Sequence, residues 1–400
     1  MPASLATASA ILKEVYEPRM RKQLDDDNVA LRRIQRSSNG VENTVGGRYV
    51  TFPIKTRRNS GIGARNELEA LPTPGQQGNA AGRIGLKYLY GGIRITGQAM
   101  KLADSNYQAF ASVLDQEVEG LRDDLAKDLN RQVYGDGSGV MCTLSAGTGN
   151  TLTANDVMYL QEGMQVDIVD GTTLANSTPT VKASNRQITA INTTNNTFTV
   201  DGASVTATAT DVVVRFGNVN REWTGLKAIV KSTGTLYNIN PAVEGVWKAS
   251  EDTNGGTPRA LSEGLLITMA DQIRAKGSYP TLILTNLGVR RAYFNLLSQQ
   301  RSYTNTKTFE GGFTGLAFTT DKGEIPMVTD TDCPKGTAYM INEKELTLYR
   351  EADWSWMDED GSKWQRVIGY DAYEATMFQY SELATHRRNA HGVITNIIEG

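Results

Sequence analysis

The sequence contains very little cysteine. Cys142 and Cys333 are the only two cysteines in 400 residues, and they form no CxxC pair. This count excludes a disulfide framework or a zinc knuckle that could be read from spacing. We expect both side chains to be free thiols in a reducing compartment.

Histidine is equally scarce, which leaves little material for a catalytic base. His386 and His391 lie five positions apart, a spacing that does not place two ligands on one face of a helix. Arg387 and Arg388 lie between them, and such cations lower a histidine pKa without supplying an orienting carboxylate. We therefore expect surface histidines and predict no catalytic residue, no metal site and no cofactor.

Long apolar runs and an excess of positive charge are also missing. No stretch approaches the roughly 18 apolar residues of a membrane span, and the N-terminus lacks the basic start and apolar run of a signal peptide. The formal net charge is −3, whereas a dedicated nucleic-acid binder needs a strong basic excess. Such a net charge is still compatible with one local basic face.

The chain is long enough for two or three domains.

Turning to what is present, residues 105–134 carry the clearest helical pattern. Their apolar residues recur every three or four positions: Tyr107, Phe110, Leu114, Val118, Leu121, Leu125, Leu129 and Val133. A helix of this length would span roughly 45 Å. That is well above the usual length in a compact domain.

The N-terminal segment 11–36 has near-helical apolar spacing, broken around Pro18, and carries Arg32, Arg33 and Arg36. A short amphipathic segment of this kind usually needs a partner surface. The three arginines are compatible with a solvated or interfacial helix face, or with weak, sequence-independent attraction to nucleic acid.

Residues 46–96 predict a long hairpin with little to bury. Two strand-like runs, 49–55 and 84–96, flank a polar stretch rich in Gly and Pro. The charged residues of this stretch are of both signs: Arg57, Arg58, Arg65, Glu67 and Glu69. An isolated hairpin is marginal in water, so we expect a neighbouring subunit to supply its contact surface through salt-sensitive contacts.

The stretch 145–218 is rich in Thr, Asn, Val and Ala and poor in charge. We predict short strands at 164–169, 186–191, 197–200 and 212–216, separated by Asn-rich turns. This pattern indicates a small β-barrel or sandwich inserted into another domain.

From 219 to 350 the pattern is α/β, and strand candidates follow to the end of the chain. Helices are expected at 261–276 and 288–298, and strands at 280–285, 325–328, 337–341, 346–349, 372–380 and 392–398. An Asp-Gly pair at 360–361 between runs 354–357 and 364–368 predicts a further hairpin. Trp354, Trp356 and Trp364 would then form cross-strand pairs rather than a ligand-stacking face.

Two motifs are rejected on context. The glycine-rich run 135–139 follows a helix, whereas a phosphate loop follows a strand and ends in Gly-Lys-Ser/Thr. A calcium loop built on 358–361 would start at Trp356 and close at Val367, neither of which is a carboxylate.

The order of these elements resembles the major capsid proteins of tailed bacteriophages, with the Hong Kong 97-like fold. LKEVYEP (12–18) is similar to the start of the family's N-arm, GRYVTFP (47–53) to its extended loop, and 105–134 to its spine helix. YPTLILTN (279–286) and GEIPMV (323–328) resemble its axial domain, and RRNA (387–390) its C-terminal peripheral ending.

The resemblance implies an α+β Hong Kong 97-like capsid fold with an inserted small all-β domain. The expected divisions are the N-terminal arm 1–45, the extended loop (E-loop) 46–96, the peripheral domain with its spine helix 97–144, the inserted β domain 145–218, the mainly axial domain 219–350 and the peripheral return 351–400. The arm and hairpin residues Arg32, Arg33, Arg36, Arg57, Arg58, Arg65, Glu67 and Glu69 are the expected inter-subunit contacts.

The implied function is structural, not enzymatic. We expect a major capsid protein that self-assembles as hexamers and pentamers into an icosahedral shell around double-stranded DNA. An encapsulin-type compartment shell is the alternative, and a cytosolic hydrolase is disfavoured by the missing catalytic motif. Because the arm begins close to Met1, we expect a separate scaffolding protein and a portal. We also expect non-specific contact with the packaged DNA and a possible decoration protein. We expect no membrane association and no covalent crosslink. The protein would assemble in the host cytoplasm and end up in the virion.

Overall fold

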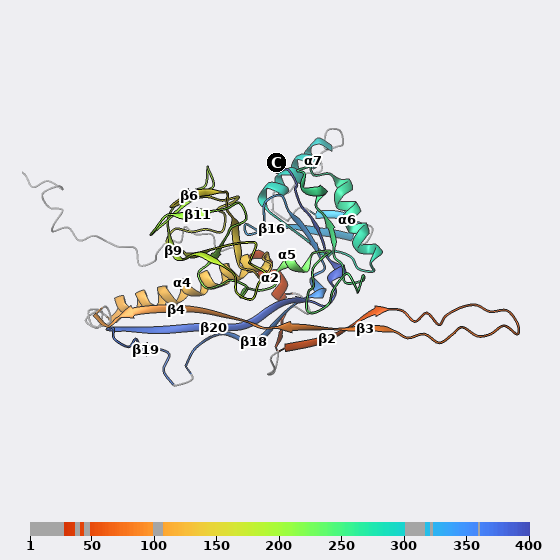
Figure 1. Cartoon of the computed structure of the whole chain (residues 1–400), viewed down its shortest axis with the longest axis horizontal. Coiled ribbons are helices and arrows are strands. Elements are labelled where there is room, and N and C mark those ends of the chain that lie inside the picture. The colour runs from red at the N-terminus through yellow and green to blue at the C-terminus, as the bar shows by residue number, and fades with distance from the viewer. Residues whose placement is uncertain are drawn as a thin grey trace, which may run out of the picture.

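A computed structural model describes residues 28–36, 41–43, 49–98, 107–300, 317–320, 323–358 and 361–400. A long sheet underlies the body of the molecule, with the helix α4 along one face (Figure 1). Its strands are β1 (Val41–Asn43), β4 (Lys87–Thr96), β18 (Leu346–Trp356), β19 (Gln365–Arg366) and β20 (Ala372–Thr385). β20 is central: it pairs with β4 on one edge and with β18 and β19 on the other.

The helix α4 (Tyr107–Val133) confirms the long helix predicted at 105–134. It packs closely on β4, because a Cβ built on Gly91 would lie 2.8 Å from Leu125 and 3.0 Å from Leu121. A second helix, α2 (Val29–Arg36), packs where α4 ends. The part of the arm before residue 28 lies outside the described residues.

Two strand predictions around the long sheet are wrong. β18 and β19 do not form the hairpin expected across 358–361, because both pair with the same edge of β20. The 14-residue β20 offers enough backbone for both, so long-range pairing overrides the local turn signal. Consequently Trp354, Trp356 and Trp364 are not cross-strand partners.

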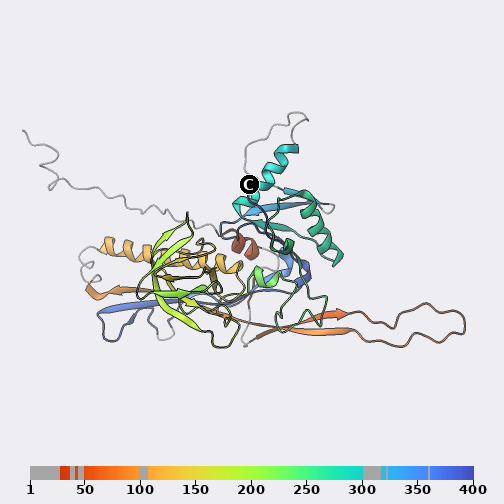
Figure 2. The same ribbon diagram turned by 45° about the horizontal axis from the view of Figure 1, so that its top comes forward.

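The strand expected at 84–96 is in fact two strands. β3 (Gly78–Gly85) pairs with β2 (Tyr49–Arg57) to form the hairpin, whereas β4 pairs with β20. Leu86 lies between them, at the point where the hairpin leaves the body of the molecule. Figures 1 and 2 both show this hairpin extending far beyond the other helices and strands of the described residues.

The four strands predicted within 145–218 are confirmed, in a six-stranded sheet with its own core. In spatial order the strands are β5 (Val140–Thr143), β12 (Val212–Arg215), β8 (Gln165–Val169), β9 (Val181–Asn192), β10 (Thr197–Val200) and β7 (Thr151–Thr153). A separate pair joins β6 (Gly147–Gly149) and β11 (Val205–Ala207). That this region is an inserted domain, like the other domain divisions, stays a prediction.

A third sheet carries two helices, α6 (Glu263–Ala275) and α7 (Leu287–Gln300). In spatial order its strands are β13 (Ser250–Asp252), β21 (Gly392–Ile394), β17 (Ala338–Ile341), β14 (Leu282–Thr285), β16 (Gly323–Thr329) and β15 (Ala317–Thr320). Alternation along β14 places Leu282 and Leu284 in the central core and Ile283 in the core under the helices. The short helices are α5 (Leu226–Ile229), η1 (Asn254–Gly256), η3 (Glu343–Glu345) and η4 (Arg388–Ala390).

Candidate functional site

The most unusual surface of the molecule is the distal half of the β2–β3 hairpin, residues 58–77 (Figure 2). Three large apolar side chains there are almost fully solvent-exposed: Ile62 is 85% exposed, Leu68 101% and Leu71 83%. The sequence reasoning singled out the charges of this segment and missed these three residues, although all are visible in the sequence. Exposed apolar side chains gathered on one protruding element mark an interaction surface.

The predicted hairpin charges are all exposed. Arg57 forms an ion pair with Glu244 of the body, at 3.6 Å. Arg65 donates from Nε to the carbonyl of Ala70 at 2.8 Å. Glu69 accepts from the backbone N–H of Asn66 at 3.0 Å, and this bond, with a second from the Asn66 side chain, lowers the pKa of Glu69. These contacts shape the tip, while Arg58 and Glu67 are exposed on it.

The root of the hairpin is held by an aromatic seat, the rings of Tyr237, Trp247 and His386 around Phe52. The centroid of the Phe52 ring lies 6.2 Å from Tyr237, 6.3 Å from Trp247 and 5.2 Å from His386. Across the hairpin, a Cβ built on Gly82 would lie only 2.4 Å from the Phe52 ring, so only glycine fits there. The root is therefore fixed to the body, while the tip is not.

The arm arginines lie on α2. The helix buries Ala30, Leu31 and Ile34 in the central core, which leaves Arg32 exposed. Arg33 forms an ion pair with Glu343 at 3.1 Å. Arg36 ends α2, and its side chain lies outside the described residues. The structure thus separates the arm arginines from the hairpin charges within one subunit.

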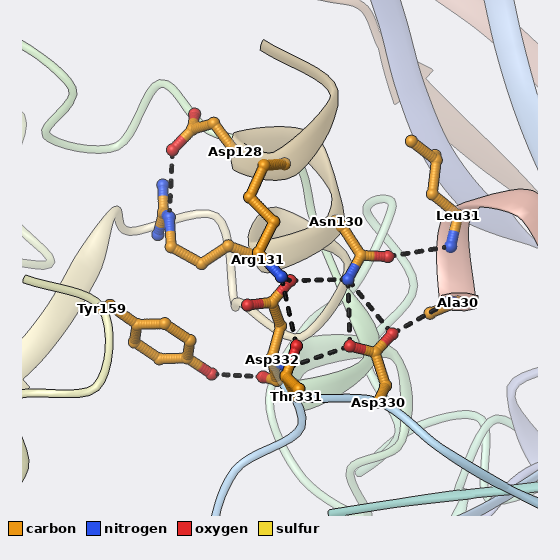
Figure 3. Close-up of polar contacts among 10 residues, drawn as sticks. Ala30, Leu31, Asp128, Asn130, Arg131, Tyr159, Asp330, Thr331 and Asp332 are labelled. Carbon is orange, nitrogen blue, oxygen red and sulfur yellow. Dashed lines mark hydrogen bonds and ion pairs between the residues drawn. The ribbon is translucent and has the colours of Figure 1, made fainter. Parts of the chain in front are cut away.

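A buried polar junction ties α2 to the rest of the molecule (Figure 3). The amide oxygen of Asn130, on α4, accepts from the backbone N–H of Leu31 at 3.1 Å. Its NH₂ group donates to Asp332 at 2.6 Å and to both oxygens of Asp330 at 3.1 Å. Asp330 in turn accepts from the backbone N–H of Ala30 at 2.9 Å. A carboxylate 300 positions away in sequence therefore caps the N-terminus of the arm helix.

The junction extends to the six-stranded sheet, because the Tyr159 hydroxyl donates to the backbone carbonyl of Asp332 at 2.6 Å. Burial raises the pKa of Asp332, while bonds from Asn130 and Lys127 act in the opposite direction. The Lys127 ammonium lies 3.2 Å from the Asp332 carboxylate. Four segments distant in sequence thus meet at one satisfied polar cluster, which fixes their relative positions.

The next residue of α4, Arg131, joins the same framework. It pairs with Asp128 at 3.1 Å and with Glu222 at 2.6 Å. Burial alone would lower the pKa of Arg131, but the two carboxylates raise it well above its ordinary value. The chain returning from the six-stranded sheet is thereby attached to the end of α4.

The expectation of surface histidines is wrong. His391 is fully buried and accepts at Nδ1 from the backbone N–H of Asn342 at 3.3 Å, while its Nε2 lies 3.0 Å from the Thr385 hydroxyl. Burial, with the nearby Arg387, lowers the pKa of His391 to about 3. His386 is part of the hairpin seat and bonds to the Tyr349 hydroxyl at 2.6 Å. Both histidines serve packing: His386 directly follows the end of β20, and His391 lies between η4 and β21.

Cys142 and Cys333 are free, as expected from the sequence, and the structure buries both. Among the described residues, no group of three His, Cys, Asp or Glu side chains has the geometry of a metal site. Within the same part of the chain, no helix is long and apolar enough to cross a membrane.

Comparison with known proteins agrees with this architecture. A family model described as SU10 major capsid protein matches residues 147–397. No curated protein matches the chain.

Solved structures match over the full length. The cyanophage A-1(L) capsid asymmetric unit is similar with a TM-score of 0.64 and 14% identity, covering 99% of both chains. The capsid of a native GTA particle is similar with a TM-score of 0.53 and 10% identity, covering 98% of both. The holo-SrpI encapsulin complex from Synechococcus elongatus PCC 7942 has a TM-score of 0.45 and 9% identity, covering 100% of this chain and 96% of that one. At such identities the likeness shows the fold, and it confirms the capsid fold expected from the sequence.

Proposed function

This chain belongs to the SU10 major capsid protein family, and from that premise we propose how it builds a shell. Copies self-assemble as hexamers and pentamers into the icosahedral capsid of a tailed phage, around double-stranded DNA. The exposed apolar tip of the β2–β3 hairpin carries this proposal. A single copy offers Ile62, Leu68 and Leu71 nothing to pack against, whereas a neighbouring copy would bury them.

The hairpin is suited to bridge two subunits because its two ends differ. The root is anchored by Phe52 in its aromatic seat, which gives the hairpin a defined direction. The tip combines apolar side chains with exposed charges of both signs, including Arg58 and Glu67. Weak contacts of this kind add up in a closed shell, because closure makes the later contacts intramolecular.

The arm supplies a second link between subunits. α2 is clamped at the Asn130 junction, so the chain before it starts from a fixed point on each subunit. Arg32, Arg33 and Arg36 would face neighbouring subunits or packaged DNA, the latter through weak, sequence-independent attraction.

The remaining partners follow from the same proposal. A separate scaffolding protein and a portal guide assembly in the host cytoplasm. The six-stranded sheet region would face outward, where a decoration protein could bind. The protein is a component of the virion capsid and has no catalytic role.

Substitution of the hairpin tip tests the proposal. Ile62→Ser, Leu68→Ser and Leu71→Ser combined should leave a folded chain, because the three side chains are exposed, but should abolish capsomers and shells. Circular dichroism checks the fold, and sedimentation velocity with negative-stain electron microscopy checks assembly. The matched control, Ile62→Val with Leu68→Met and Leu71→Met, keeps the tip apolar and should assemble. Assembly of the serine variant at the wild-type level would contradict the proposal.

A further inference from the structure

Glu382 is a buried carboxyl group at the point where the hairpin leaves the body. It lies on β20 and is 1% exposed. One carboxyl oxygen accepts from the backbone N–H of Thr224 at 2.6 Å. The other, Oε2, is buried and has no hydrogen-bond partner among the described residues. An ionised carboxylate with only one donor is costly in such surroundings, and a neutral carboxyl group costs much less.

The position of Glu382 couples it to the hairpin root. β4 begins at Lys87, one residue after Leu86, and Lys87 pairs in register with Ser381. The next residues along β20 support the seat: the Leu383 carbonyl accepts from the Tyr237 hydroxyl at 3.2 Å. Tyr237 holds the hairpin directly, through its ring against Phe52 and its carbonyl, which accepts from the Arg83 N–H at 3.0 Å.

Few charged groups face Glu382. Lys87, on β4, is the cation that acts on it, yet its ammonium donates to the backbone carbonyl of Asn220 at 3.2 Å. Tyr237 comes from the segment before β13, and its own pKa is raised by burial first and then by the Glu382 charge, with Arg388 acting in the opposite direction. Tyr349 on β18 is the register partner of Glu382. Among the described residues, the cation that acts on Glu382 is therefore engaged by the Asn220 carbonyl.

We propose that Glu382 and Lys87 form a proton-operated switch at the root of the hairpin. With Glu382 neutral, Lys87 holds the Asn220 carbonyl, and the hairpin root is seated. Loss of the proton leaves a buried carboxylate that draws Lys87 away from Asn220, and this weakens the contact between β4 and the returning chain. The inference rests on the proposed function, because it regulates the hairpin assigned there to subunit contact.

The direction of the effect follows from the two protonation states. Burial raises the pKa of Glu382 from 4.5 to about 8. Between pH 4.5 and about pH 8, Glu382 therefore keeps its proton when the hairpin root is seated and loses it when the root is open. Seating is strongest at low pH within this range, is lost as pH rises toward about 8, and changes no further above it.

Hydrogen exchange of the full, unassembled chain tests the switch. Protection of peptides from β2 and β3, corrected for the intrinsic exchange rate, should fall about tenfold per pH unit between pH 5 and 8 and then level off. Glu382→Gln keeps the acceptor for Thr224 and cannot ionise, so its profile should be flat relative to the wild type. His386 is common to both proteins, so their difference isolates Glu382.

A second variant distinguishes the role of Lys87 from the role of the Glu382 carboxyl group. Lys87→Met removes the cation, so the fall in protection should continue to higher pH than in the wild type. Identical pH profiles for the wild type and Glu382→Gln would overturn the switch and leave the shell proposal untouched. Failure of the wild type to assemble would overturn the shell proposal, yet leave this exchange result standing.

Discussion

Replacing Phe52 by alanine should release the hairpin without unfolding the body. Phe52 is 7% exposed and packs against Tyr237, Trp247 and His386. Removing a buried phenylalanine typically costs about 3–5 kcal/mol, of which aromatic pairing supplies about 0.5–1.5 kcal/mol per pair. The other contacts of the hairpin with the body include the Arg83 N–H bond, the buried Ile84 and the exposed Arg57–Glu244 ion pair, and we expect them to be too weak to keep the root seated. We therefore expect local release at a cost of about 3 kcal/mol.

Two assays separate seating from global folding. The change in tryptophan fluorescence between variant and wild type reports the seat, because Trp247, one of the five tryptophans, has its ring beside Phe52. Urea unfolding followed by far-ultraviolet circular dichroism reports the body. Phe52→Leu is the control and should cost less than about 1.5 kcal/mol. We expect the alanine variant alone to lose assembly while retaining secondary structure. An alanine variant that assembles normally despite a released seat would refute the role given to the root.

The remaining predictions concern the interior. Asp330→Asn should lower the free energy of unfolding by about 2–3 kcal/mol in a urea titration, because charge-assisted bonds to the arm helix are lost. The exposed control Asp353→Asn should lower it by less than about 0.5 kcal/mol. Equal effects of the two substitutions would contradict the stabilising role given to the Asn130 junction. Cys142 and Cys333 should not react with a thiol reagent at pH 8 in the native chain, because both are buried and burial raises the pKa of Cys142 to about 12; rapid native labelling would count against this packing. His391, neutral when folded, should make stability fall as pH drops from about 6.5 toward 3, since the unfolded chain gains the proton; His391→Gln should flatten that slope, and an unchanged slope would exclude His391 as its source.

Local periodicity accounts for the elements that could be predicted. The apolar spacing of α4 and α6 and the strand runs of β8, β10 and β14 are properties of neighbouring residues, so the sequence alone located them. The hairpin was also visible, because β2 alternates and the stretch after it is polar.

Pairing partners and buried polar contacts could not be predicted in this way. β18 and β19 share an edge of β20 because β20 is long, and no turn signal contains that information. Asn130 meets Asp330 across 200 positions, and His391 is buried with its ring nitrogens against Asn342, 49 positions away, and Thr385. Tertiary packing sets each of these pairings and buried contacts, so the identities of neighbouring residues in the sequence do not predict them. The tip residue Leu68, in contrast, was readable as an apolar residue without a partner.

Cryo-electron microscopy of particles formed by the full chain, co-expressed with its scaffolding protein, tests the central claim most directly. The account predicts closed icosahedral shells of hexamers and pentamers in which the side chains of Ile62, Leu68 and Leu71 are buried against a neighbouring copy. Shells in which these three side chains remain in solvent, or a chain that stays monomeric at high concentration, would contradict it.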